Sequence, residues 1–214
     1  EALALPTDVG NPTEVKKAFS EIQQQWGRMD ILINNAGVVE PIAPLVKCRD
    51  DALLQSLQTN VYGTYLCTRE ALKHMMEENR EEGTIINITS GAAKKPYHGW
   101  SAYSSQKAAV DMFTRCVALE VKELPIRIAA IAPGTFESNM QELIRSKSEE
   151  DFPARPKFVK LHQEGHLSKP EDVAKSIVAI ALSDWPELSG RITDIRSSEF
   201  QEECRRRGIE IRGV

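Results

Sequence analysis

The chain of 214 residues alternates short apolar runs with longer stretches in which apolar residues recur every three or four positions. The short runs are typical of buried β-strands, and the periodic stretches are typical of amphipathic helices. Strands with few polar residues, alternating with such helices, predict a parallel sheet covered on both faces. The expected strands lie in the segments EALALPTDV, DILINNAG, GTIINITS, IRIAAIAPG and GRITDIR.

Helix start and stop signals bound the stretches between these strands. Asn11, Pro12 and Glu14 predict a helix start with a cap and a capping box, and Gly27 predicts its end. A long helix is expected over residues 50–78. The other expected helices cover residues 101–123, a patch at 140–145 in a polar, irregular segment, residues 170–182, and a last helix capped by Ser198 and stopped by Gly208.

Composition and charge narrow the class of protein. The net charge is −4 and the pI about 5.7, which is not typical of a nucleic-acid-binding surface. No apolar run reaches the roughly 18 residues of a membrane span. The four cysteines have no paired spacing and predict reduced thiols in a cytoplasmic protein. No metal site is expected, because His162 and His166 have no third ligand and Gly165 weakens a helix between them.

Polar residues follow four of the predicted strands. Ligands of parallel sheets bind beyond the carboxyl ends of the strands, so these residues are expected to share one cleft. They are Asp8, Asn34 to Gly37, Ser90, and Pro133 with Gly134. Tyr103 and Lys107 stand one helical turn apart on the helix that follows Ser90. A Tyr/Lys pair alone is more often a solvated helix face than a proton-transfer pair, so the neighbouring motifs decide between the two interpretations.

In order and spacing, these motifs resemble the short-chain dehydrogenase/reductase family. The matching pieces are NNAG at 34–37, Asn60, Ser90 after IINIT, YSSQK at 103–107 and PG at 133–134. The resemblance extends from Asp8 to about Arg196, and local similarity is greatest to the sepiapterin reductase and benzil reductase branch. It implies an α/β, Rossmann-like doubly wound parallel sheet in three layers. One domain is expected over residues 1–214, with residues 135–168 as a substrate-binding lid.

The resemblance implies hydride transfer between NAD(P) and a small carbonyl or alcohol substrate. Tyr103 would be the acid/base, with its pKa of about 10 lowered by the Lys107 charge. Lys107 would also hold the nicotinamide ribose. Ser90 would bind the carbonyl oxygen, and Asn60 would hold a water that links Lys107 to solvent.

The remaining site residues are also carried by the resemblance. The implied cofactor contacts are Asp8, Val9, Asn34, Ala36, Gly37, Tyr103, Lys107, Pro133, Gly134, Phe136 and Ser138. The implied substrate contacts are Ser90, Tyr97, Trp100 and Asp194. Plainer roles stay open for several of them: Asp8 as a turn residue, Asn34 as a strand-end cap, Tyr97 and Trp100 as loop anchors, and Asp194 as an exposed strand end.

The given chain shows no glycine-rich turn of the kind that holds a pyrophosphate at a helix N-terminus. In family terms the first two β-α units are missing, and we expect them to lie upstream. A chain that began at Glu1 would have DILIN as an edge strand and would bind NAD(P) weakly. The residue that separates NADP from NAD would lie in the same segment, and the branch resemblance favours NADP.

Two other function classes are weighed against the reductase. A non-catalytic relative of the same fold, acting as a scaffold or binding protein, is the alternative. A serine hydrolase using Ser90, His98 and Asp111 is disfavoured because no G-x-S-x-G elbow surrounds Ser90. A homodimer or homotetramer is expected through the helices at 50–78 and 101–123. Their apolar residues exceed the needs of one sheet face at Leu66, Met75, Met76, Met112 and Phe113.

Overall fold

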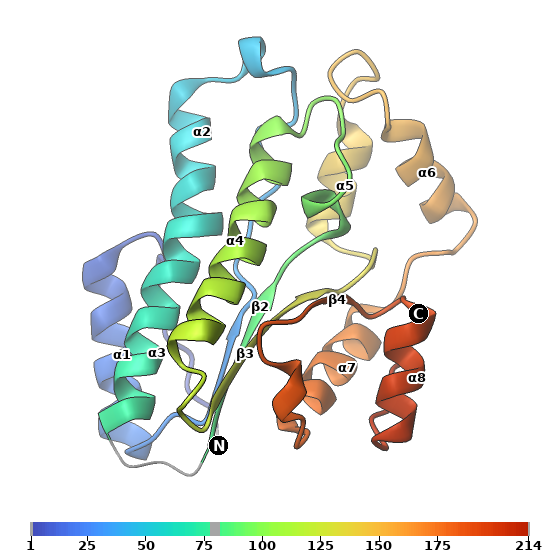
Figure 1. Cartoon of the computed structure of the whole chain (residues 1–214). Coiled ribbons are helices and arrows are strands. Elements are labelled where there is room, and N and C mark those ends of the chain that lie inside the picture. The colour runs from blue at the N-terminus through green and yellow to red at the C-terminus, as the bar shows by residue number, and fades with distance from the viewer. Residues whose placement is uncertain (1, 78–81, 214) are drawn as a thin grey trace.

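A computed structural model describes residues 2–77 and 82–213 of the chain. Four parallel strands form one sheet in the order β1-β2-β3-β4. They are β1 (Ile31–Asn34), β2 (Gly83–Ile88), β3 (Ile126–Ala132) and β4 (Ile192–Asp194). Helices lie on both faces of this sheet (Figure 1). The α/β layered fold expected from the sequence is confirmed.

The helices form three groups around the sheet (Figure 1). One face is covered by α1 (Pro12–Trp26), α2 (Asp50–Leu57), α3 (Thr64–Glu77) and α4 (Ser101–Glu120). The other face is covered by α7 (Pro170–Leu182) and α8 (Ser198–Arg206). Beyond the carboxyl ends of the strands lie α5 (Asn139–Ser146) and α6 (Arg155–Gln163). Single helical turns lie at Leu45–Lys47, Gly91–Ala93 and Pro186–Leu188.

Alternate side chains of the central strands enter opposite cores, as the two-residue period of a strand requires. Ile85 and Ile128 pack with the residues of α3 and α4 in one core. Ile86 and Ile131 pack with those of α7 and α8 in the other. All four side chains are fully buried. The sheet is therefore covered on both faces, which explains why its strands are apolar almost throughout.

The helix expected over residues 50–78 is interrupted. A π-helical segment, η2 (Gln58–Gly63), separates α2 from α3, and Glu78 lies outside the described residues. The expected strand in EALALPTDV is not formed in residues 2–9, where the chain has no regular structure. Accordingly, β1 is an edge strand of the described sheet.

The predicted helix start and end are confirmed for α1, whereas the predicted cap of the last helix is displaced by one residue. Asn11 caps α1 and Gly27 ends it with a φ of 70°, as predicted. The last helix is capped by Ser197, whose side chain accepts a hydrogen bond from the backbone N–H of Phe200, and not by Ser198. The segment expected to be irregular also holds a second helix, α6, whose Phe158 is buried among aromatic side chains.

The apolar residues of α3 and α4 that we expected at a subunit interface lie partly in the core and partly on the surface. Leu66 and Met75 are only 1% and 2% exposed and belong to the core, so that expectation is wrong for them. Met76 and Met112 are 57% and 56% exposed, as expected. Phe113 is half-buried and stacks on Tyr65, which ties α4 to α3.

The close approach of Gly63 to Val9 generates a stability prediction. A Cβ atom on Gly63 would lie 2.7 Å from Val9 Cγ2 and 3.1 Å from Val9 O. We expect Gly63→Ala to lower the free energy of unfolding by about 1–3 kcal/mol, as overpacking does. Val9→Ala in the same protein should recover part of that loss, because it removes the nearest clashing atom. Urea unfolding of the two single variants and the double variant measures this coupling, and strictly additive losses would contradict it.

Candidate active site

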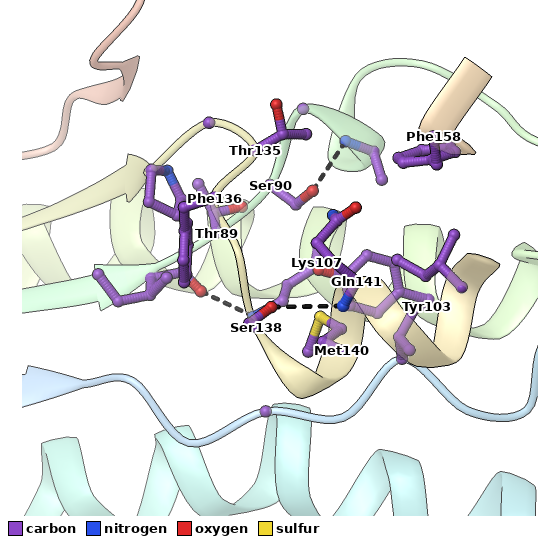
Figure 2. Close-up of a pocket in the computed structure, with 18 of the residues that line it drawn as sticks. Thr89, Ser90, Tyr103, Lys107, Thr135, Phe136, Ser138, Met140, Gln141 and Phe158 are labelled. Atoms are coloured by element: carbon purple, nitrogen blue, oxygen red, sulfur yellow. Dashed lines mark hydrogen bonds between the residues drawn. The ribbon is translucent and has the colours of Figure 1, made fainter. Parts of the chain in front are cut away.

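A cavity of about 170 Å³ lies between the carboxyl ends of the strands and the helices α5 and α6. Strand ends, the start of α4 and the segment after β3 all contribute to its lining (Figure 2). The cavity brings together ten of the residues that the sequence singled out: Gly37, Ser90, Tyr97, Trp100, Tyr103, Lys107, Pro133, Gly134, Phe136 and Ser138.

Tyr103 and Lys107 are side by side because they are one turn apart on α4. Their exposed fractions are 8% and 6%, so a solvated helix face does not describe them. Lys107 Nζ donates a hydrogen bond of 2.8 Å to the backbone oxygen of Ile88, the last residue of β2. It also lies 5.9 Å from the centre of the Tyr103 ring. A buried phenol and a buried amine thus share one wall of the cavity.

The pKa of the Tyr103 phenol is raised by burial, and a hydrogen bond with the Ser90 side chain lowers it in part. The sequence led to the opposite expectation, a pKa lowered by Lys107. That expectation is wrong for this structure, because removing water from the phenol disfavours its charged form more strongly. The phenol is therefore protonated at neutral pH.

Burial also changes the amine beside the phenol. It lowers the pKa of Lys107 from 10.5 to about 8, while the Asp111 carboxylate one turn further along α4 raises it in part. Lys107 can therefore both hold and release a proton near physiological pH. The pKa of Asp111 is itself raised by burial.

Asn60 lies in the π-helical segment η2 and is almost fully buried. Its side chain accepts from the Val38 N–H at 2.8 Å and donates to the Val38 oxygen at 2.8 Å. It also donates to Gln106 Oε1 at 2.6 Å, and Gln106 donates to Ser56 Oγ at 2.8 Å. These bonds use both side-chain N–H groups of Asn60 and one lone pair of its Oδ1. The main-chain oxygen accepts from Thr64 Oγ1 at 3.0 Å. The expected water-holding role of Asn60 stays a prediction.

Ser90 ends β2 and begins the turn toward α4. Its Oγ accepts from the Ala92 N–H at 3.2 Å and is turned toward the cavity (Figure 2). The structure does not support the serine hydrolase alternative. His98 is exposed and is not part of the cavity wall, and no hydrogen bond links it to Ser90 in the described ranges. Asp111 faces Lys107 instead.

Four of the expected cofactor residues lie outside the cavity. Asp8 is exposed, and its Oδ1 accepts from the Gly10 N–H at 2.8 Å, as in a turn. Val9 packs against Gly63. Asn34 donates to Thr68 and Asn87 at 3.0 and 2.8 Å, so its amide belongs to the core. Ala36 is exposed, whereas its neighbour Asn35, which we had not singled out, lines the cavity. Cofactor contact by these four residues stays a prediction.

Asp194 does not line the cavity, although a substrate role was expected for it. Both carboxylate oxygens are bound by Arg196, at 2.9 Å from Nε and 2.7 Å from Nη2. Arg196 takes the place in the wall, beside Gly134. Gly134 has a φ of +79°, and a Cβ there would lie 2.9 Å from Arg196 Cδ. Asp194 ends the last strand and Arg196 follows two positions later. This spacing of opposite charges was the sequence signal for their ion pair, which we had not singled out.

Aromatic side chains form the outer wall of the cavity. Tyr97 lies 5.0 Å from Trp100, and Trp100 lies 5.4 Å from both Tyr103 and Phe158, measured between ring centres. Phe152 stacks on Trp100 at 4.6 Å. Tyr97 and Trp100 therefore both anchor their loop through ring contacts and line the cavity. Phe152 and Phe158 were not expected, because their helix and turn were not.

No group of three or more His, Cys, Asp and Glu side chains in residues 2–77 and 82–213 is arranged to hold a metal ion. No helix in the described part of the chain combines the length and apolar character of a membrane span.

The comparisons with known proteins agree with this geometry. Residues 1–149 match the short chain dehydrogenase family. A benzil reductase ((S)-benzoin forming) of Bacillus cereus is 42% identical over 173 residues, which cover 79% of this chain and 69% of that protein. The corresponding enzyme of Bacillus subtilis (strain 168) is 40% identical over 167 residues, covering 77% and 68%.

Solved structures give the same result. The KRED1-Pglu enzyme superposes with a TM-score of 0.81 at 33% identity, over 89% of this chain and 78% of that one. ElxO with NADP bound has a TM-score of 0.73 at 30% identity, over 87% and 73%. These relatives and structures support NAD(P)-dependent oxidoreduction as the general activity. The chain belongs to the short-chain dehydrogenase/reductase family, and its substrate is a small molecule.

The residues present fit the nicotinamide end of such a cofactor. Buried polar groups of Tyr103 and Lys107 converge on a space bordered by the backbone of Gly37 and Gly134. Phe136 supplies an apolar surface beside them (Figure 2). A flat aromatic ring with a polar edge is the kind of group that such a wall binds.

The buried lysine generates a stability prediction. A folded-state pKa of about 8, below the ordinary 10.5, means that folding disfavours the charged amine. The cost is fully present below pH 8 and is relieved as the pH rises from 8 toward 10.5. We expect Lys107→Met to be more stable than the wild type at pH 7, on the order of 2 kcal/mol after loss of the Ile88 bond, with a smaller advantage at pH 9.5.

Urea unfolding at the two pH values measures this difference. Lys122→Met is the matched control, because Lys122 has an exposed side chain and should give no such trend. A Lys107→Met protein that is less stable than the wild type at pH 7, with a difference independent of pH, would contradict the assigned cost of burial.

Proposed function

We propose that the protein is an NADPH-dependent carbonyl reductase in which Tyr103 protonates the oxygen of an aromatic ketone. The observation that carries this proposal is the convergence of the Ser90 hydroxyl and the neutral, buried Tyr103 phenol on one cavity, with Lys107 one turn behind. A ketone oxygen bound there accepts a hydrogen bond from each hydroxyl.

Because the Tyr103 phenol is protonated, it favours the direction of reduction, in which a proton is donated. When bound, the nicotinamide of NADPH supplies the hydride to the carbonyl carbon. Tyr103 gives its proton to the carbonyl oxygen, which becomes the hydroxyl of the alcohol product. Lys107, with a pKa of about 8, stabilises the phenolate and returns a proton to it. Asn60 acts as a positioning residue, because its amide joins η2 to Val38 and to the helix of the catalytic pair.

Aromatic substrates are supported by the wall of Tyr97, Trp100 and Phe158, which offers ring faces and edges to a bound aryl group. The two benzil reductases at 42% and 40% identity act on such a compound by name. NADPH is supported by ElxO, solved with NADP at 30% identity. We further propose that residues 135–168 form the lid of this site within one domain, since α5 and α6 lie over the strand ends (Figure 1).

Replacement of the phenol tests the acid. Tyr103→Phe should lower kcat for an aryl ketone by about 10²- to 10⁴-fold, the contribution of a positioned acid, while the Kd for NADPH changes little. Initial rates with NADPH and NADH, together with a fluorescence titration, measure both quantities on the full-length protein. Tyr62→Phe, on the exposed Tyr62, is the matched control. Near-normal turnover in Tyr103→Phe would remove Tyr103 from the mechanism.

We also propose assembly through α3 and α4, which lie next to each other on one face of the molecule (Figure 1). Met76, Met112 and Leu119 are 57%, 56% and 71% exposed on these helices. Light scattering should give a dimer or tetramer at micromolar concentration, and Met112→Glu should dissociate it, because the charge would be buried. Val46→Glu, on a side chain that is 95% exposed in the turn Leu45–Lys47, should leave the mass unchanged. A monomeric wild type would contradict the proposal.

A further inference from the structure

Gln141 is a buried amide whose side chain has no partner in the described part of the chain. Its exposed fraction is 7%, and its Oε1 is buried without a hydrogen bond. Its side-chain nitrogen makes no hydrogen bond to the described residues either. The side chain lines the cavity that holds Ser90, Tyr103 and Lys107. A buried polar group without a partner is destabilising, so we expect a ligand atom to bind at this position.

The backbone of Gln141 is held in place. Ser138 Oγ accepts from the Gln141 N–H at 3.3 Å and so caps α5. Arg145, one turn further, is bound to Glu137 at 2.8 Å, and Arg155 Nε donates to the Arg145 oxygen at 2.7 Å. The helix is therefore tied at both ends. In Figure 2 the Gln141 side chain projects from α5 into the space between Ser90 and Tyr103.

The other cavity residues with an unpartnered buried polar atom are weaker candidates for binding a ligand atom. They are Thr89 and Trp100. Thr89 has the Asp111 carboxylate beside it. The Trp100 indole is enclosed by the rings of Tyr97, Tyr103, Phe152 and Phe158. Of these three residues, only Gln141 offers a donor and an acceptor on two separate atoms beside Ser90 and Tyr103.

We propose that Gln141 binds a second substrate oxygen on the carbon next to the ketone that is reduced. This rests on the proposed function, because Ser90 and Tyr103 must hold the first oxygen. An amide suits a vicinal pair of oxygens in both oxidation states. Its N–H₂ donates to the second carbonyl of a 1,2-diketone, and its oxygen accepts from the hydroxyl of an α-hydroxy ketone. The residue is thus a specificity determinant, and the proton still comes from Tyr103.

Two ketones that differ only in the second oxygen test the assignment. Benzil carries two adjacent carbonyl groups, and deoxybenzoin has the same two phenyl rings with a methylene in place of one carbonyl. Initial rates with NADPH give kcat/KM for each ketone with the full-length wild type, Gln141→Leu, Gln141→Asn and the control Gln163→Leu. Gln163 is exposed at the end of α6. A ketone that binds without being reduced is compared through its inhibition constant.

We expect Gln141→Leu to lower the ratio of benzil to deoxybenzoin kcat/KM by about 10- to 100-fold, the effect of one buried hydrogen bond to substrate. Gln141→Asn should lower it less, and Gln163→Leu should not change it. An unchanged ratio in Gln141→Leu overturns the proposal. A uniform loss on both ketones with weaker NADPH binding also overturns it and assigns the amide to the cofactor. A wild type that oxidises NADPH with neither ketone would instead refute the proposed function itself.

Discussion

A chain of buried hydrogen bonds through the sheet sets the geometry on which the site depends. Asn34 at the end of β1 donates to Thr68 on α3 and to Asn87 on β2, and Asn87 donates to Thr114 on α4 at 2.9 Å. Asn87, Thr68 and Thr114 are fully buried. A buried amide that loses its partner is costly, so two strands and two helices are held in one register. Ser90 follows Asn87 by three residues, and Lys107 precedes Thr114 by two helical turns.

A second buried network lies next to Lys107 on α4. Ser56, Gln106 and Asn60 join α2, α4 and η2, and Asn60 also binds both polar backbone atoms of Val38. Gln106 immediately precedes Lys107. The helix held by these bonds also carries the buried amine of Lys107, and its pKa of about 8 reflects the cost of removing that amine from water. Under the proposed mechanism, this loss of stability keeps a cation next to the Tyr103 phenol.

Four of the five expected strands are confirmed, as is the pairing of Tyr103 with Lys107 on one helix, because hydrophobic period and residue spacing follow from backbone geometry. The strand expected in EALALPTDV is not formed in the described residues. The sequence did not predict the side-chain choices that depend on tertiary contacts. Asn34 and Asp194 are examples, because the sequence left two roles open for each of them. Only the structure shows that Asn34 donates to Thr68 and Asn87 and that Asp194 accepts from Arg196. The direction of the Tyr103 pKa belongs to the same group, because burial cannot be read from a four-residue spacing.

The site divides between two parts of the fold with different freedom to change. Ser90 follows β2, and Tyr103 and Lys107 lie on α4. The buried networks hold these two elements at Asn87, Gln106 and Thr114. Gln141, Phe152 and Phe158 come from α5, α6 and the turn between them. These segments form the outer wall of the cavity beyond the strand ends. If the proposed function holds, a substitution in the first part disturbs both the core register and the proton transfer. A substitution in the second part alters the shape and polarity of the wall while Tyr103 stays in place, so the proposed reaction is kept while the choice of substrate varies.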